Sequence, residues 1–151
     1  MSDSFLRIIP SSPTYIPAEG VGQALTSLLK RELPNAEGVE IVVNDEVVFV
    51  DQGENFERVQ CPTCKQTIDT EWWQSALDSA SEKQFSDLVV TVPCCSKKLS
   101  LNDLEYHWPA GFSRYVVEVR EPGQQAPLTA EAVAQIETLL GHAVRQIFTR
   151  Y

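Results

Sequence analysis

The chain has 151 residues, of which 43% are hydrophobic and 22% are charged. These proportions are typical of one globular domain, or of a small domain that carries a smaller module, and they exclude a largely disordered chain. Twelve Lys and Arg residues are outnumbered by 21 Asp and Glu residues. The resulting net charge of -9, with the basic residues scattered along the chain, disfavours nucleic acid as a partner.

The first residues, MSDSFLRIIP, lack the basic start and long apolar run of a signal peptide. No segment approaches the roughly 20 apolar residues that a membrane span requires. We therefore expect a cytoplasmic protein without a membrane partner. Thiols are kept reduced in the cytoplasm, so clustered cysteines there indicate metal binding or redox chemistry rather than structural disulfides.

The N-terminal third predicts the order strand, helix, strand, strand. FLRIIP (residues 5–10) has the composition of a strand, and residues 18–33 carry leucines at helical spacing until Pro34 ends the helix. In VEIVVNDEVVFVD (residues 39–51), two β-branched runs flank Asn44 and Asp45. This pattern predicts a β-hairpin with a tight polar turn.

A segment of different character follows, and it contains all four cysteines and all three tryptophans. We interpret residues 56–108 as an inserted module. Its elements are a helix within residues 67–84, a short strand over residues 87–92 that ends at Pro93, and a turn of helix capped by Ser100. No internal repeat is evident in the sequence.

The C-terminal third predicts a strand over residues 111–121 and a helix over residues 128–151. Thr129 is the expected cap of this helix, and Gly141 is a residue at which it can break. Together these elements predict an α+β fold. Residues 1–55 and 109–151 would form one domain, an antiparallel sheet packed by the N- and C-terminal helices, and residues 56–108 would form an inserted zinc-binding module.

The cysteines occur in two tight clusters, Cys61 and Cys64 in CPTC and the adjacent pair Cys94 and Cys95 in VPCC. Two residues between cysteines allow both sulfurs to turn toward one ion. Sulfurs around a tetrahedral zinc ion lie about 3.8 Å apart, close to the spacing of consecutive Cα atoms, so adjacent cysteines can also share an ion. Side chains alternate along a strand, so the chain must leave strand geometry at this pair. We expect these four residues to bind structural Zn²⁺.

Three other uses of the cysteines remain open. The first is a disulfide between the neighbours Cys94 and Cys95, which closes a strained ring. The second is a set of unpaired thiols, because cysteine is among the most buried residue types. The third is mixed ligation, in which His107 replaces one of the adjacent cysteines.

The span from Cys61 to Cys95 resembles the zinc ribbons, which hold one structural zinc ion between two cysteine loops on paired hairpins. The resemblance covers about a quarter of the chain, and the second loop is shortened to Pro-Cys-Cys. The combination of CPTC, VPCCSKKLSLNDL and WPAGF also resembles a group of bacterial proteins. That resemblance implies the metal site and no particular activity.

No sequence motif of an enzyme accompanies the cysteines, such as HExxH, GxSxG or a glycine-rich phosphate loop. Four cysteine ligands close a zinc site to substrate, so we expect a non-catalytic protein. Thiol-disulfide exchange through Cys61 and Cys64 is the main alternative, because CPTC precedes a helix and a Val-Pro follows. A zinc-ribbon protein that binds nucleic acid is the second.

We expect the partner to be another protein, bound by an aromatic patch. The candidate residues are Trp72, Trp73, Trp108 and Phe112. Trp72 and Trp73 are about 100° apart on a helix, so both cannot face the core fully. The alternative is that these aromatic residues simply form the core of the inserted module.

Overall fold

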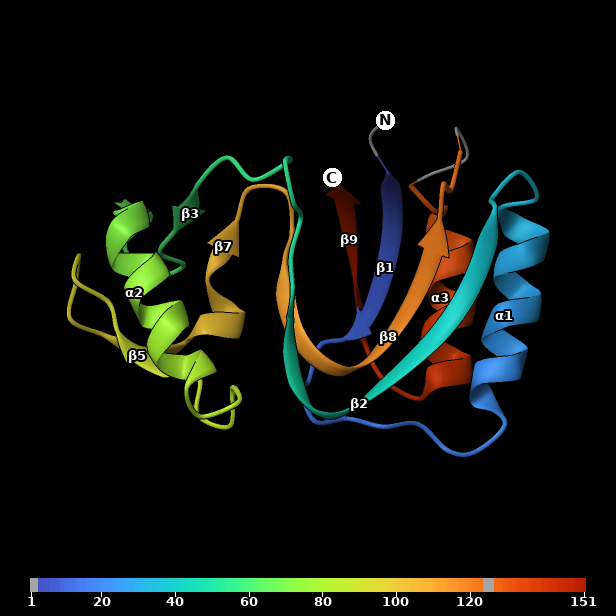
Figure 1. The fold of residues 1–151 in the computed structure, drawn as a ribbon, viewed down its shortest axis with the longest axis horizontal. Coiled ribbons are helices and arrows are strands. Elements are labelled where there is room, and N and C mark those ends of the chain that lie inside the picture. Colours follow the sequence, from blue (N-terminus) through green and yellow to red (C-terminus); the bar gives the residue numbers. More distant parts are fainter. Residues whose placement is uncertain (1–2, 124–126) are drawn as a thin grey trace.

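The computed structural model describes residues 3–123 and 127–151. Its larger part is an antiparallel sheet of four strands in the order β2-β8-β1-β9. The strands are β1 (Ser4–Pro10), β2 (Gly38–Val50), β8 (Gly111–Arg120) and β9 (Val144–Arg150). Two helices, α1 (Val21–Glu32) and α3 (Ala130–Leu140), cover one face of this sheet (Figure 1). The α+β class that the sequence predicts is therefore confirmed.

The main core lies between the sheet and these two helices. Leu6 and Ile8 of β1 point toward the helices, because side chains alternate along a strand. Leu25 and Leu29 of α1 meet them from the opposite layer, as helical spacing requires. All four side chains are buried, so the periodicities in the sequence identify the core faces of β1 and α1.

The predicted hairpin at Asn44 and Asp45 is wrong, because residues 38–50 form a single strand. Both halves of β2 pair with β8, and a bulge separates the pairs Val43–Tyr115 and Val48–Ser113. Within this bulge, Arg114 donates a hydrogen bond from Nε to the Asn44 carbonyl oxygen at 3.0 Å. The ten residues of β8 offer a partner to both halves of β2, so its polar residues form a bulge and not a turn.

The C-terminal helix is shorter than predicted, and the expected helix over residues 142–151 is a strand. Gly141 adopts a left-handed conformation (φ 79°) and its N–H bonds the Glu137 carbonyl at 2.9 Å, which ends α3. The chain then reverses, and β9 pairs with β1 along seven residues. These pairs satisfy the backbone of β1, so strand pairing outweighs the helical spacing of the apolar residues.

Residues 56–108 form a second lobe, here called the cysteine lobe (Figure 1). It contains the helix α2 (Thr70–Ser81), a short 3₁₀ helix (Leu101–Asp103) and two small antiparallel sheets, β4-β3-β7 and β5-β6. The strands are β3 (Val59–Gln60), β4 (Thr67–Ile68), β5 (Val89–Thr91), β6 (Lys98–Ser100) and β7 (Glu105–Tyr106). No strand of this lobe exceeds three residues, so sheet pairing alone fixes little of it.

Aromatic side chains fill the core of the cysteine lobe. Trp73 stacks on Phe56 with ring centroids 5.3 Å apart, and its Nε1 donates to Tyr106 Oη at 3.3 Å. Tyr106 Oη in turn donates to the Leu101 carbonyl at 2.6 Å. Burial raises the pKa of Tyr106 to about 12. Phe112 of β8 belongs to the same cluster, so the lobe packs on one end of the large sheet.

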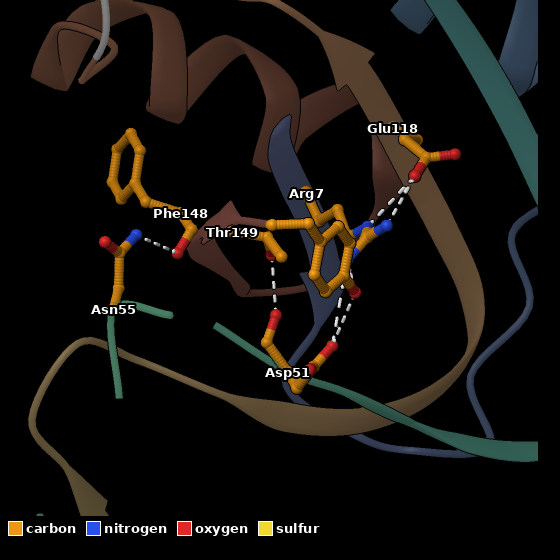
Figure 2. A network of polar contacts seen from close by, with 7 residues as sticks. Arg7, Asp51, Asn55, Glu118, Phe148 and Thr149 are labelled. Carbon is orange, nitrogen blue, oxygen red and sulfur yellow. Dashed lines mark hydrogen bonds and ion pairs between the residues drawn. The ribbon is translucent and has the colours of Figure 1, made fainter. Parts of the chain in front are cut away.

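The segment after β2 crosses to the outer edge of β9 (Figure 2). There the Thr149 hydroxyl donates to the Asp51 carbonyl at 2.6 Å, and Asn55 Nδ2 donates to the Phe148 carbonyl at 3.0 Å. Nearby, Arg7 Nη2 pairs with Glu118 Oε1 at 2.8 Å. The contacts of Asp51 and Asn55 with β9 cover part of an otherwise open strand edge. Among the helices in the described residues, none is long and apolar enough to cross a membrane.

Candidate metal centre

The four cysteine sulfurs converge in the cysteine lobe, and each lies within 4.8 Å of the others. Cys61 Sγ lies 3.9 Å from Cys95 Sγ, and Cys64 Sγ lies 3.2 Å from Cys94 Sγ. Four thiolates around a tetrahedral zinc ion lie about 3.8 Å apart, so the arrangement fits one ion with small shifts. All four thiols are free of disulfides. The group can therefore hold a metal ion.

The first cysteine pair lies in a tight loop between β3 and β4. The N–H of Cys61 donates to the Gln66 carbonyl at 2.9 Å, and the N–H of Lys65 donates back to the Cys61 carbonyl at 3.0 Å. Lys65 adopts a left-handed conformation (φ 65°) that turns the chain into β4. This loop directs both sulfurs to the same side.

The second pair lies in a loop of the same construction between β5 and β6. The N–H of Val92 donates to the Lys97 carbonyl at 3.0 Å, and the N–H of Ser96 donates to the Val92 carbonyl at 2.9 Å. Ser96 is also left-handed (φ 60°). The chain thus leaves strand geometry at the adjacent cysteines, as the sequence predicts, and Cys94 and Cys95 both reach the cluster.

The two loops form a structural repeat, although no internal repeat is evident in the sequence. Hydrogen bonds, left-handed residue and flanking strands all recur 31 positions later, from 61 to 92 and from 65 to 96. In this alignment Cys64 corresponds to Cys95, but Cys61 corresponds to Val92. Cys94 takes the place of Thr63. The residues shared by the two segments, VQCPTC and VTVPCC, are the first valine, the proline and the final cysteine.

Hydrogen bonding makes the thiols of Cys61 and Cys94 unequal in acidity. Burial opposes ionisation of Cys61 most strongly, but the backbone N–H groups of Cys64 and Thr63 and neighbouring thiols outweigh it and lower the pKa of Cys61 to about 6. The hydrogen bond with the Cys64 thiol, together with burial, raises the pKa of Cys94 to about 12. A bound metal ion would hold both sulfurs as thiolates.

The histidine and lysine residues near the loops have other partners or face solvent. His107 Nε2 lies 3.0 Å from Gln60 Oε1 and is not a member of the sulfur cluster, so mixed ligation through His107 has no support. Lys65 Nζ pairs with Glu105, and Lys97 and Lys98 are exposed. Cys61 is fully buried, whereas Cys95 is exposed, so the cluster opens toward solvent at the second loop.

Neither protein-family models, nor curated proteins, nor solved structures gave a match to the chain. The resemblance to zinc ribbons therefore rests on the two cysteine loops alone.

The four aromatic candidates for a partner surface have different environments. Trp73 and Phe112 are buried, with exposed fractions of 5% and 0%, and belong to the core of the cysteine lobe. This burial excludes them from a surface patch. Trp72 is partly buried against the same core. Trp108, with 44% of its surface exposed, is the candidate that remains available.

Trp108 is held in an unusual conformation beside a cavity. Its backbone is left-handed (φ 64°), which is strained for a tryptophan, and the buried Gln52 donates from Nε2 to its carbonyl at 3.1 Å. The indole Nε1 donates to Glu57 at 3.3 Å. A cavity of about 350 Å³ lies beside it, lined also by Phe5 and Phe148. Those two rings come from β1 and β9, and no sequence pattern connects them with Trp108.

Proposed function

We propose that this protein is a non-catalytic zinc protein in which the four cysteines hold structural Zn²⁺ and the cysteine lobe supports a surface for another protein. The approach of four sulfur atoms from two loops to within 4.8 Å carries the metal assignment. A tetrahedral set of thiolates suits Zn²⁺ among the common ions.

The metal would stabilise a lobe that has little regular structure. Its two cysteine loops belong to different small sheets, β4-β3-β7 and β5-β6, which have strands of two or three residues. One ion bound by both loops ties these sheets together, so metal binding contributes directly to the free energy of folding. When bound, zinc supplies a closed, four-coordinate centre and no reactive position.

The surroundings of Cys61 argue against thiol-disulfide exchange. A nucleophilic cysteine in a redox CxxC motif needs solvent access and is commonly placed at a helix N-terminus. Cys61 is fully buried and is followed by β4, and α2 begins only at Thr70. The low pKa of Cys61 is equally expected of a metal ligand, whose sulfur receives hydrogen bonds from the loop backbone.

Trp108 supports the proposal of a protein partner. Exposed tryptophans beside pockets are frequent centres of binding energy in protein interfaces. The cavity at Trp108 is lined by aromatic rings and two prolines, Pro122 and Pro127, and suits an apolar side chain of a partner. The net charge of -9 disfavours the alternative of a nucleic-acid partner.

Native mass spectrometry with elemental analysis tests the metal. We expect one zinc ion per chain in the wild type, and loss of that ion in Cys64→Ser and Cys95→Ser. His107→Ala is the matched control and should keep the metal, because this side chain contacts Gln60 instead. Metal-free protein whose mass falls by two hydrogens on oxidation would overturn the assignment in favour of thiol exchange.

Affinity capture from the host, with quantification of bound proteins, tests the partner surface. A partner retained by the wild type and lost with Trp108→Ala supports the proposal. Val89→Ala is the control, since Val89 is exposed and apolar but does not line the cavity. Equal capture by Trp108→Ala, or capture that disappears on nuclease treatment, would contradict it.

A further inference from the structure

The strand β2 lies at an open edge of the large sheet (Figure 1). In the strand order β2-β8-β1-β9 it pairs with β8 alone among the described strands. Every second residue of a strand directs its backbone N–H and C=O groups away from such a partner. On that outer side of residues 38–43, these groups have no hydrogen-bond partner in the part of the chain that the structure describes. The opposite edge, at β9, is partly covered by Asp51 and Asn55.

Residues 38–43 lack the features that commonly protect an open edge. Their sequence, GVEIVV, contains no Lys or Pro, and its regular pairing with β8 continues until the bulge after Val43. Natural proteins often use lysines, prolines or bulges to prevent further strands from pairing at such an edge. Val43 is apolar and 55% of its surface is exposed. This segment is therefore a template on which another strand can pair.

A cavity of about 500 Å³ lies on the α1 side of this edge. Val39, Ile41 and Val43 face that side, because their partners in β8 belong to the main core. The cavity is lined by Ile41 and by small or polar residues at the start of α1, which are Gly20, Gly22, Gln23, Thr26 and Ser27. A strand added beside β2 would place every second side chain on this side of the sheet. The cavity has room for one apolar side chain of such a strand.

The open edge also carries negative charge without a counterion. Glu40 is exposed on the sheet face opposite α1, and Asp45 and Glu46 are exposed in the bulge that follows. None of the three forms an ion pair within the described ranges. A lysine or arginine opposite a glutamate on a neighbouring strand is a favourable pair. Pairing of β2 with β2 of a second copy would instead bring acidic residues together, in chains that each have a net charge of -9.

We propose that residues 38–43 bind an extended segment of a partner protein by strand addition, and that this segment alternates basic with β-branched residues. Backbone hydrogen bonds to the open edge hold the segment. Its basic side chains lie on the face of Glu40, and its apolar side chains point toward the cavity beside Ile41. This surface shares no residue with the zinc centre or with the cavity at Trp108, so it is independent of the proposed function.

Hydrogen exchange followed by NMR tests the proposal with two synthetic peptides. The probe is a capped peptide of about seven residues that alternates Lys and Val, and the control has the same sequence with N-methyl groups on its three central residues. The control keeps the charge and the side chains but loses backbone donors. At a probe concentration ten times its Kd, every second amide in residues 38–43 should exchange about tenfold more slowly. Equal protection by both peptides, or protection confined to other strands, would overturn the proposal.

Charge-reversal variants test which side of the edge the peptide occupies. Glu40→Lys should weaken binding of the Lys-Val peptide by about fivefold, because a favourable cross-strand pair becomes a repulsive one. Glu54→Lys makes the same change of net charge at an exposed position outside this edge and should bind as the wild type does. Equal affinities of the two variants would contradict the proposal. Sedimentation of the free protein tests the other occupant: a dimer that already protects these amides would overturn the proposal in favour of a second copy.

Discussion

Val92 takes the position in the second cysteine loop that Cys61 takes in the first. Both residues donate a backbone hydrogen bond to the residue five positions later and accept one from the residue four positions later. Both side chains are fully buried. The second loop therefore has the same backbone conformation as the first. Its first cysteine is Cys94, which lies two positions after the residue equivalent to Cys61.

The first prediction is that a cysteine at position 92 can replace Cys94 as a metal ligand. Cys94→Thr alone removes one candidate ligand, and metal affinity should fall by about 100-fold or more, since loss of an outer hydrogen-bond partner alone costs roughly 10- to 100-fold. The double variant Val92→Cys with Cys94→Thr recreates the pattern of CPTC and should regain most of the affinity. Competition with a zinc-binding dye measures both.

Val92→Cys alone is the matched control, because it tests whether a thiol is tolerated at this buried position. If the double variant binds zinc no better than Cys94→Thr, the equivalence of Val92 and Cys61 does not extend to their side chains.

The second prediction concerns metal removal. Treatment with a chelator should loosen both cysteine loops, so the amide hydrogens of Cys61 and Val92 should exchange at least about tenfold faster. The amides of β1, which pair on both sides within the large sheet, should change little. Hydrogen exchange followed by mass spectrometry measures this difference. Added Zn²⁺ should restore protection and Mg²⁺ should not; unchanged exchange after chelation would argue against a structural role for the metal.

The third prediction concerns the joint between the cysteine lobe and the large sheet. The buried Asn102 donates from Nδ2 to the Ser11 carbonyl at 2.9 Å, and its Oδ1 accepts from the Phe112 N–H at 3.0 Å. Asn102→Ala strands both backbone groups, so the free energy of unfolding should fall by about 3 kcal/mol. Chemical denaturation measures this loss. Asn55→Ala, which removes a single bond to Phe148, should cost about 1 kcal/mol; equal losses would contradict the assigned role of Asn102.

The fourth prediction concerns stability at high pH. The pKa of Tyr106 is about 12 in the folded protein, against 10 for an ordinary tyrosine. Between these values the unfolded chain releases the proton and the folded protein keeps it, so the free energy of unfolding falls as the pH rises from 10 to 12. The full loss from this group is about 3 kcal/mol, because each pKa unit corresponds to roughly 1.4 kcal/mol.

Denaturation at a series of pH values tests this prediction with Tyr106→Phe as the reference. The variant is expected to be less stable at neutral pH, because it loses the bonds to Trp73 and Leu101. Its stability should nevertheless decline less between pH 10 and 12. Parallel profiles for the two proteins would show that Tyr106 ionises equally easily in both states.

Local patterns in the sequence predict an element correctly when pairing or packing with other segments does not change its conformation. The spacing of the leucines in α1 and the composition of FLRIIP in β1 identify a helix and a strand correctly. The same reasoning failed for residues 142–151. Their apolar spacing suits a helix, but pairing with β1 and the left-handed Gly141 make them a strand.

The sequence by itself determined which atoms can bind a metal ion, because the chemistry of CPTC and VPCC depends only on residue type and close spacing. Only the tertiary structure decided that Val92 occupies the position equivalent to Cys61, that Trp73 and Phe112 are buried, and that Trp108 lines a cavity together with Phe5 and Phe148. Each of these facts depends on contacts between segments far apart in the chain. Packing and strand pairing across the whole molecule determine such contacts, and the local spacing of residues does not specify them.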